Sequence, residues 1–271
     1  MRASIPSPSS GVVHLGPLPL RAYAGFILLG AVLAVYFGDK RWVARGGKPG
    51  FVADVAATAV PAGLVGARIY HVLTSRQDFY FSHPVEMLKI WQGGLGIWGG
   101  IAGGAVGAWW VLRKHGIPFL DFADALAPFL PLAQAVGRLG NYFNQELYGR
   151  RTSLPWGLEI DAAHSPGGNS PGTYQPTFLY ELLWDLGVVG LVLWADNRWK
   201  LGRGRAFALY VAAYCAGRLW IEALRIDDAH KLFGIRLNDF TSGILFLAAA
   251  AFLWLRRGSR EPSPVDVPSS A

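Results

Sequence analysis

Charge is scarce in this chain. Asp, Glu, Lys and Arg make up only 16% of its 271 residues, whereas a soluble domain carries about 25%. Cys215 is the only cysteine, so an internal disulfide is excluded, and its place within an apolar run predicts a small buried residue. The sequence shows no metal-ligand cluster and no nucleic-acid-binding motif, although its net charge is +7. Its amino-terminal segment also lacks the basic start and apolar core of a signal peptide.

Apolar residues are abundant instead. They make up 52% of the chain, which also contains 34 glycines and 11 tryptophans. Glycine permits close contact between helices in a membrane, and tryptophan is enriched at membrane interfaces. The alternative is a glycine-rich soluble α/β domain, which would have shorter apolar runs with more charge between them. The composition therefore predicts an all-α polytopic membrane protein.

Seven apolar runs divide the chain. Each is close to the roughly 20 residues that a helix needs to cross the hydrocarbon core of a bilayer. The runs are 22–38, 53–73, 94–112, 122–140, 177–195, 206–223 and 239–255. We therefore predict one integral membrane domain over residues 1–271 with seven transmembrane helices. No internal sequence repeat indicates the paired halves of a transporter.

Lysine and arginine are unevenly distributed between the predicted loops. They are denser in 39–50, 113–121, 196–205 and 256–271 than in 1–21, 74–93, 141–176 and 224–238. Because cytoplasmic loops carry an excess of these residues, the amino terminus is predicted outside and the carboxyl terminus in the cytoplasm. The outer segments then include an interfacial segment at 74–93 and a head region at 141–176, with an irregular loop over 161–176. The polar, proline-rich tail 257–271 is predicted to be disordered.

Several charged residues lie within the predicted helices or at their edges. Among them are Arg68, Asp124, Arg138, Glu181, Asp185, Arg218 and Glu222. An ionised group at mid-membrane costs several kcal/mol, so such residues are expected to face a polar cavity and to serve a function. The alternative is structural ion pairing between helices, and for Asp124 and Glu222 both interpretations stay open.

Spacing brings several polar residues onto one helix face. Gln134, Arg138, Asn141 and Gln145 stand at i, i+4, i+7 and i+11. If the helix persists to Gln145, these residues form one polar stripe on an otherwise apolar cylinder. The two glycines of the stretch "GRLG" leave room beside the arginine for another helix or a bulky headgroup.

A second predicted helix repeats this pattern. Arg218, Glu222 and Arg225 stand at i, i+4 and i+7, so the faces that carry Arg138 and Arg218 are predicted to converge near the outer leaflet. Guanidinium groups suit a phosphodiester, which offers paired oxygens and negative charge. This pattern suggests a phospholipid headgroup as the ligand.

The stretch "GRLGNYFNQELYG" at 137–149 resembles the signature of the bacterial prolipoprotein diacylglyceryl transferases. Further segments resemble the same family in the same order: "LGPLPLRAYAGFILLG", "GARIYHVL", "IWQGGLGIWGGIAGG", "QPTFLYE" and "YCAGRLWIEALR". The resemblance runs from about Leu15 to Leu255. The central motif is specific, and its combination with the others is stronger than any one of them alone.

The resemblance implies a defined reaction. Members of this family transfer the diacylglyceryl group of phosphatidylglycerol to the lipobox cysteine thiol of a prolipoprotein, so that a thioether forms and glycerol-1-phosphate leaves. The implied fold is a seven-helix bundle in the bacterial plasma (inner) membrane, with a head that faces the periplasm. The family uses no metal or cofactor. The implied partners are phosphatidylglycerol, prolipoprotein signal peptides and membrane lipids, with no nucleic acid.

The resemblance also assigns catalytic residues. Arg138 and Arg218 match two arginines that are expected to hold the lipid phosphate and to stabilise charge on the departing phosphate. Glu146 matches a carboxylate that supports an arginine or accepts a proton. Tyr23 matches a tyrosine of the first helix.

Substrate binding is assigned, besides Arg138, to Asn141, Asn144, Gly149, Tyr214, Arg68 and Trp98. The two asparagines are interpreted as orienting donors, and Gly149 as a requirement of the backbone. Tyr214 stands four residues before Arg218 and shares its helix face. For either tyrosine alone, an anchor at the membrane interface would be the simpler interpretation.

Trp98 is a departure from the family pattern. Many members have a histidine at this position, which is often regarded as the catalytic base. Trp98 is expected instead to fill the space lined by Gly94, Gly96, Gly99 and Gly100 beside the lipid. His71 is the only histidine inside a predicted span, and a lone helical histidine is more often structural than catalytic. A thiol is partly ionised at neutral pH, so its reaction does not require a strong base. Water, Glu146 and the leaving phosphate remain as candidate proton acceptors.

Two other classes of protein remain open. In a transporter or channel, the intramembrane charges would line a conduction path, usually with broken helices and repeated halves. A structural membrane scaffold would not need polar stripes at this energetic cost. The clustering of polar residues at the outer ends of spans four to six favours the enzyme.

Overall fold

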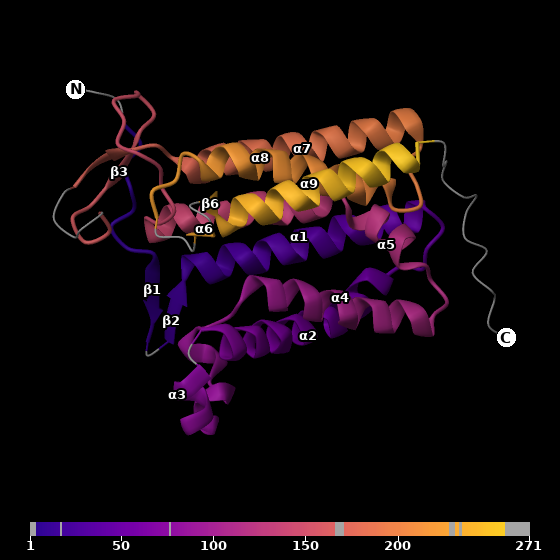
Figure 1. The fold of residues 1–271 in the computed structure, drawn as a ribbon, viewed down its shortest axis with the longest axis horizontal. Coiled ribbons are helices and arrows are strands. Elements are labelled where there is room, and N and C mark those ends of the chain that lie inside the picture. The colour runs from indigo at the N-terminus through magenta and orange to yellow at the C-terminus, as the bar shows by residue number, and fades with distance from the viewer. Residues whose placement is uncertain are drawn as a thin grey trace. The chain divides into compact units, whose positions relative to one another are not determined.

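The computed structural model describes residues 4–16, 18–75, 77–165, 171–227, 231–232 and 235–257, and most of these are helical (Figure 1). The chain forms two compact units, which are described separately. The first unit comprises Met1–Phe37 and Ala123–Ser263, and the second comprises Gly38–Phe122 and Pro264–Ala271. From residue 258 onward, the tail that the sequence predicts to be disordered lies outside the described residues.

Helices cover all seven apolar runs. They are α1 (Ala22–Ala44), α2 (Phe51–Thr74), α4 (Ile97–Lys114), α5 (Phe119–Leu126), α6 (Phe129–Asn144), α7 (Thr177–Trp199), α8 (Arg205–Glu222) and α9 (Leu237–Leu255). By length and composition, α1, α2, α7 and α9 can each cross a membrane, and the bent pair α5 and α6 is a fifth candidate among the described helices. The predominantly helical class is confirmed. The count of seven spans stays a prediction, because α4 and α8 are not among these candidates. α4 is rich in glycine and tryptophan and ends in Arg113 and Lys114, and α8 carries Arg205, Arg218 and Glu222.

The prediction of a single helix over 122–140 is wrong. α5 ends at Leu126, α6 starts at Phe129, and the two helix axes differ by 48°. Pro128 stands at the break. Proline has no N–H to donate, and its ring clashes with the carbonyl group four residues earlier, so the helix is interrupted there.

Asp124 lies just before this bend, and its carboxylate caps the amino-terminal end of α8. Gly204 N donates to Asp124 Oδ2 at 2.7 Å, and Phe207 N donates to Oδ1 at 2.8 Å. These N–H groups belong to the first turn of a helix, where they lack partners within the helix and carry partial positive charge. The contact favours the structural interpretation of Asp124, whose side chain is fully buried.

Four helices of the first unit pack in sequence order. α7 packs against α6 and α8, and α8 packs against α9. Figure 1 shows α7, α8 and α9 running along one another. Val188, Val192 and Ala195 of α7 form a buried apolar core with Ala206 of α8. Because this core fixes α7 against α8, it also fixes the polar side chains that the two helices carry.

The predicted head region 141–176 contains a short antiparallel hairpin. β3 (Leu158–Ile160) pairs with β4 (Gly172–Tyr174). The expectation of an irregular loop over 161–176 is therefore wrong for 172–174, whereas residues 166–170 lie outside the described residues. The amino-terminal segment joins this hairpin, because Ile5 N donates to Gly157 O at 2.8 Å and Glu159 N donates to Ile5 O at 2.9 Å.

Two further hairpins precede α1 and α9. They are β1 (Val12–Leu15) with β2 (Leu18–Arg21), and β5 (Lys231–Leu232) with β6 (Ile235–Arg236). Together with the β3–β4 hairpin, they correct the expectation of an all-α chain. Each is short, and the β3–β4 hairpin contributes Leu158, Ile160 and Tyr174 to a buried apolar cluster with Phe178 of α7.

In the second unit, α2 packs along α4 through glycine. A Cβ placed on Gly66 would lie 2.3 Å from Gly99 O, and one placed on Gly99 would lie 2.2 Å from Gly66 O. Only small residues allow two helix backbones to approach so closely. The expectation that Gly99 borders a space that Trp98 fills is therefore wrong, because α2 occupies it. The same holds for Gly94 and Gly96, which face side chains of α2.

The segment between α2 and α4 exposes large apolar side chains. It forms α3 (Gln77–Ser82) and two 3-10 turns, η1 (Pro84–Leu88) and η2 (Ile90–Gln92). Phe81, Leu88 and Trp91 are each more than 60% exposed. Aromatic and apolar side chains of this kind are typical of a membrane interface, and the interfacial position of 74–93 stays a prediction.

Candidate active site

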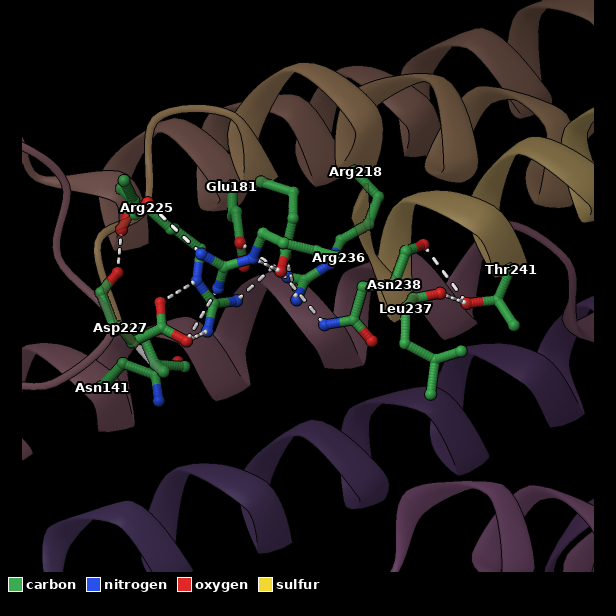
Figure 2. Close-up of polar contacts among 12 residues, drawn as sticks. Asn141, Glu181, Arg218, Arg225, Asp227, Arg236, Leu237, Asn238 and Thr241 are labelled. Atoms are coloured by element: carbon green, nitrogen blue, oxygen red, sulfur yellow. Dashed lines mark hydrogen bonds and ion pairs between the residues drawn. The ribbon is translucent and has the colours of Figure 1, made fainter. Parts of the chain in front are cut away.

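Two arginines from different helices meet at one carboxylate. Arg138 of α6 forms an ion pair through Nε with Oε2 of Glu181 on α7. Arg218 of α8 donates from Nη1 to the other oxygen, Oε1, at 2.9 Å. Figure 2 shows Glu181 and Arg218 in this contact. The predicted convergence of the two arginine-bearing faces is confirmed, and Glu181 is the residue that joins them.

Glu222 connects this pair to the start of α9. Its side chain is fully buried, and its Oε2 lies 2.7 Å from Arg218 Nη2. Its Oε1 accepts hydrogen bonds from Arg236 Nε at 2.7 Å and from Asn238 Nδ2 at 3.1 Å. A carboxylate buried this deeply is stable only when its oxygens are paired. The structural interpretation of Glu222 is therefore favoured, and its contacts orient Arg218.

Arg225 and Asp227 extend the network beyond the end of α8. Arg225 donates from Nε and Nη2 to the two oxygens of Asp227, at 2.7 and 2.9 Å, and Arg236 Nη2 lies 3.0 Å from Asp227 Oδ2. Partial burial alone would raise the pKa of Asp227. The hydrogen bonds and charge of Arg225, together with the charge of Arg236, nevertheless hold this pKa below its ordinary value.

A small cavity lies among α6, α7 and α8. Its volume is about 10 Å³, which is room for about one water molecule. The lining residues are Arg138, Glu181, Trp184, Asp185, Tyr214, Gly217, Arg218 and Ile221. Tyr214 therefore shares a cavity with both arginines, as its position one turn before Arg218 predicts.

An apolar groove lies on the other side of Trp184. Its volume is about 460 Å³, and α7 and α8 provide all the residues that line it. They are Tyr180, Leu183, Trp184, Gly187, Val188, Leu191, Ala213 and Trp220. Trp184 lines both spaces, so the polar cavity and the apolar groove adjoin at this residue.

Glu146 accepts hydrogen bonds from both asparagines of the signature. Asn141 Nδ2 donates to Glu146 Oε1 at 2.8 Å, and Asn144 Nδ2 donates to the same oxygen at 3.1 Å. Asn141 Oδ1 in turn accepts a hydrogen bond of 3.4 Å from Arg138 Nη1. Glu146 thus acts on Arg138 through Asn141, which agrees with its interpretation as a support for an arginine.

The predicted polar stripe does not reach Gln145. α6 ends at Asn144, because Gln145 adopts a left-handed conformation with a φ of 50°. Its Nε2 donates to Pro8 O at 3.0 Å and to Asp161 Oδ2 at 2.9 Å. The prediction for Gln145 is therefore wrong, since its side chain fastens the amino-terminal segment to the head region.

Glycine beside the site admits other parts of the chain. A Cβ on Gly140 would lie 2.6 Å from Cδ2 of Tyr23, so the predicted room beside Arg138 is occupied by α1. This contact places Tyr23 against the signature helix. A Cβ on Gly149 would lie 2.9 Å from Leu224 O. The backbone requirement at Gly149 is therefore a steric one.

Arg68 belongs to the second unit, where its guanidinium binds the backbone of the loop before α4. Its guanidinium donates to four backbone carbonyls, among them Glu86 O at 2.6 Å, Met87 O at 2.8 Å and Gly93 O at 2.8 Å. A buried guanidinium that is satisfied in this way is typical of a structural arginine. The contacts therefore favour a structural role over the substrate binding that the resemblance implies.

Trp98 and His71 are also residues of the second unit. Trp98 lies in the first turn of α4 and is partly buried. His71 Nδ1 lies 3.1 Å from Ser75 Oγ, and the imidazole packs edge-on against the ring of Tyr80. These contacts explain the presence of His71 without a catalytic role and favour its structural interpretation.

Several residues of the arginine cluster were not assigned to the site from the sequence. Among them are Glu181, Asp185, Asp227, Arg236 and Asn238. Glu181 and Asp185 carried a signal, because they are charges one helical turn apart within an apolar run. Arg236 and Asn238 carried none, since they follow a polar loop and reach Glu222 only through the packing of α9 on α8.

Apolar helices that are long enough to cross a membrane, with arginines and carboxylates buried between them, indicate a helical membrane protein with a charged site between its helices. The sequence matches the family described as prolipoprotein diacylglyceryl transferase over residues 10–255, and the chain belongs to that family.

Relatives of this family resemble the chain closely. It is 60% identical over 261 residues to phosphatidylglycerol–prolipoprotein diacylglyceryl transferase 1 of Streptomyces coelicolor, which covers 95% of this chain and 75% of that protein. It is 61% identical over 255 residues to the transferase of Streptomyces griseus, covering 93% and 77%. For the transferase of Rhodococcus jostii the identity is 52% over 274 residues, covering 96% and 76%. The resemblance that the motifs indicate is thus confirmed over most of the chain.

Proposed function

We propose that this chain transfers the sn-1,2-diacylglyceryl group of phosphatidylglycerol to the lipobox cysteine thiol of a prolipoprotein. The product is a thioether, glycerol-1-phosphate leaves, and the reaction is the first step of lipoprotein maturation. Membership of the family supports the reaction, and the names of the relatives support both substrates. The buried arginine pair supports the recognition of a phosphodiester.

The arginine pair is the observation that carries the proposal. Arg138 and Arg218 line one cavity, and neither guanidinium is saturated by its neighbours. Arg138 Nη2 and Arg218 Nε make no hydrogen bond within the part of the chain that the structure describes. Two guanidinium groups with N–H groups to spare can bind the paired oxygens of a phosphodiester.

The same pair serves the chemical step. The thiolate attacks the glyceryl carbon that bears the phosphate, and charge develops on the phosphate oxygen as the carbon–oxygen bond breaks. Preorganised positive groups in a site shielded from water stabilise such charge strongly. In this assignment Glu181 and Asn141 orient the two guanidiniums, and Glu146 holds Asn141 and Asn144 in place.

The remaining assignments follow from position and from the family. Tyr23 and Tyr214 lie next to the signature helix and the cavity, respectively, and we assign them to the headgroup and the reacting centre. We assign Gly149 to the backbone of the binding site and Trp98 to lipid contact. No metal or cofactor enters the reaction.

The proposed setting is the bacterial plasma membrane. Seven helices would span it, with the amino terminus and the head at 141–176 on the periplasmic side and the carboxyl terminus in the cytoplasm. This orientation rests on the Lys and Arg bias of the loops. It places the head on the side of the membrane where prolipoproteins emerge.

The test is transfer by the purified protein in detergent with phosphatidylglycerol and a lipobox peptide. We expect a thioether-linked peptide and one glycerol phosphate released for each transfer. A peptide with serine in place of the lipobox cysteine is the matched control and should give neither product. Absence of both products from the cysteine peptide, with folded protein, would reject the proposed function and leave a transporter or scaffold as the explanation of the buried charges.

A further inference from the structure

Asp185 stands out among the carboxylates of the arginine cluster. It follows Glu181 by one helical turn on α7, so the two side chains share a helix face. Asp185 is 2% exposed and lines the cavity that Arg138 and Arg218 also line. Its Oδ2 is buried and has no hydrogen-bond partner among the described residues.

An unpaired buried carboxylate oxygen is unusual. Such a group loses its hydrogen bonds to water without replacing them, and most buried polar atoms are therefore hydrogen-bonded. Glu181 Oε2 and Glu222 Oε2 also make no hydrogen bond among the described residues, but each forms an ion pair with an arginine, as does the other oxygen of each carboxylate. Asp185 is therefore the carboxylate of this cavity with an oxygen available to a ligand.

We propose that Asp185 is the group that accepts the proton of the lipobox thiol, an inference that rests on the proposed function. The thiol proton moves to Asp185 Oδ2, and the sulfur forms a bond to the glyceryl carbon that bears the phosphate. The carbon–oxygen bond breaks, and its electron pair leaves with glycerol-1-phosphate. The proton then passes from Asp185 to the released phosphate or to water. No other reactant is required.

The surroundings of Asp185 single it out for this step. The groups that face it are the guanidiniums of Arg138 on α6 and Arg218 on α8, the carboxylate of Glu181 on its own helix, and the phenol of Tyr214 on α8. Both oxygens of Glu181 are already in ion pairs with arginine. The indole at position 98, where many family members have histidine, cannot accept a proton.

The rival explanation is that Asp185 only balances the charge of the two arginines. A selenocysteine lipobox peptide separates the two roles, because a selenol is largely ionised at neutral pH and needs no base. With the cysteine peptide, Asp185→Asn should lower kcat about 100-fold or more, as expected for loss of a general base. With the selenocysteine peptide, the same variant should come within about tenfold of the parent. KM for phosphatidylglycerol should change little.

Equal loss on both peptides would assign Asp185 to charge balance, and full activity of Asp185→Asn on cysteine would remove it from the reaction. Should Asp185→Asn not fold, Asp185→Glu keeps the carboxylate and shifts it by about one methylene. This variant should have a lower kcat than the parent with the cysteine peptide and a kcat close to that of the parent with the selenocysteine peptide. An equal loss of kcat with both peptides would again overturn the proposal.

Asp54→Asn is the matched control. Asp54 is an exposed carboxylate near the start of α2, and its replacement should leave the transfer activity with both peptides unchanged. A parent protein that modifies neither peptide would reject the proposed function itself. That result differs from failure of the Asp185 assignment, which requires an active parent.

Discussion

The indole ring of Trp184 lies directly on the backbone of Gly217. A Cβ at residue 217 would be 2.0 Å from the indole Nε1, and that nitrogen donates a hydrogen bond to Ala213 O at 2.9 Å. Trp184 of α7 is thus held against α8 at the point where the polar cavity and the apolar groove adjoin. The contact requires glycine at position 217.

Gly217→Ala should therefore displace Trp184. We expect a loss of about 1–3 kcal/mol in stability from overpacking, together with reduced transfer activity. Thermal unfolding in detergent and the transfer assay measure the two effects. Gly190→Ala in α7 is the control, since a Cβ there meets nothing within 4 Å. Equal melting temperatures for the two variants would show that the Trp184 contact is not maintained in solution.

Arg138→Lys should abolish most of the activity although it keeps the charge. Arg138 uses Nε for Glu181 and Nη1 for Asn141, and one ammonium group cannot reproduce this planar arrangement. We expect kcat to fall about 100-fold or more, as for removal of one donor from a charge-stabilising site. Arg198→Lys, an exposed position near the end of α7, is the control. Near-normal turnover of Arg138→Lys would contradict the assignment of the phosphate to Arg138.

The ion pairs of Asp227 should contribute to stability in a pH-dependent way. Because its folded-state pKa lies below the ordinary value of 3.8, the contribution is present above that value and is lost as the pH falls through the lower, folded-state pKa. The difference in melting temperature between the parent and Asp227→Asn should be constant near neutral pH and shrink below about pH 4. A difference that stays constant to pH 2 would show that Asp227 acts through packing alone.

Membrane orientation can be tested with single cysteines. Ala163 is exposed in the head region, unlike the neighbouring Ser165, which is buried. In a Cys215→Ala background, Ala163→Cys should react with an impermeant thiol reagent in intact cells. Ser259→Cys should react only after the cells are opened, because the Lys and Arg bias places the tail inside. Labelling of Ser259→Cys in intact cells would reverse the proposed orientation.

Trp98 should contribute bulk and not proton transfer. Trp98→Phe keeps the bulk and is expected to lower activity only modestly, on the order of tenfold for loss of a hydrogen bond from the indole N–H to a lipid headgroup oxygen. Trp98→Ala removes more contact area and should cost more. The pH–rate profile of Trp98→Phe should match that of the parent, since indole does not titrate near neutral pH. A shifted or missing limb in that profile would show that position 98 governs proton transfer.

Some features of the site were predictable because they depend on local spacing. Arg138 and Arg218 stand out as charges in apolar runs, and the motif around each indicates its chemistry. The left-handed turn at Gln145 was not predictable, because glutamine rarely adopts a positive φ and no glycine marks the end of α6. Glu181 was visible as a charge, but its position between the two arginines depends on how α7 is rotated against α6 and α8.

The class of this protein follows from its amino-acid sequence. Apolar runs of spanning length and a scarcity of charge are properties of composition and period, and hydrocarbon imposes helices on such segments because backbone groups must be satisfied within each one. Which charges on different helices are partners depends on the packing of the helices. The approach of Arg236 and Asn238 to Glu222, the seating of Trp184 on Gly217 and the unpaired oxygen of Asp185 all depend on the packing of neighbouring helices. That packing is set by side-chain shape across residues far apart in the chain, which no local pattern encodes.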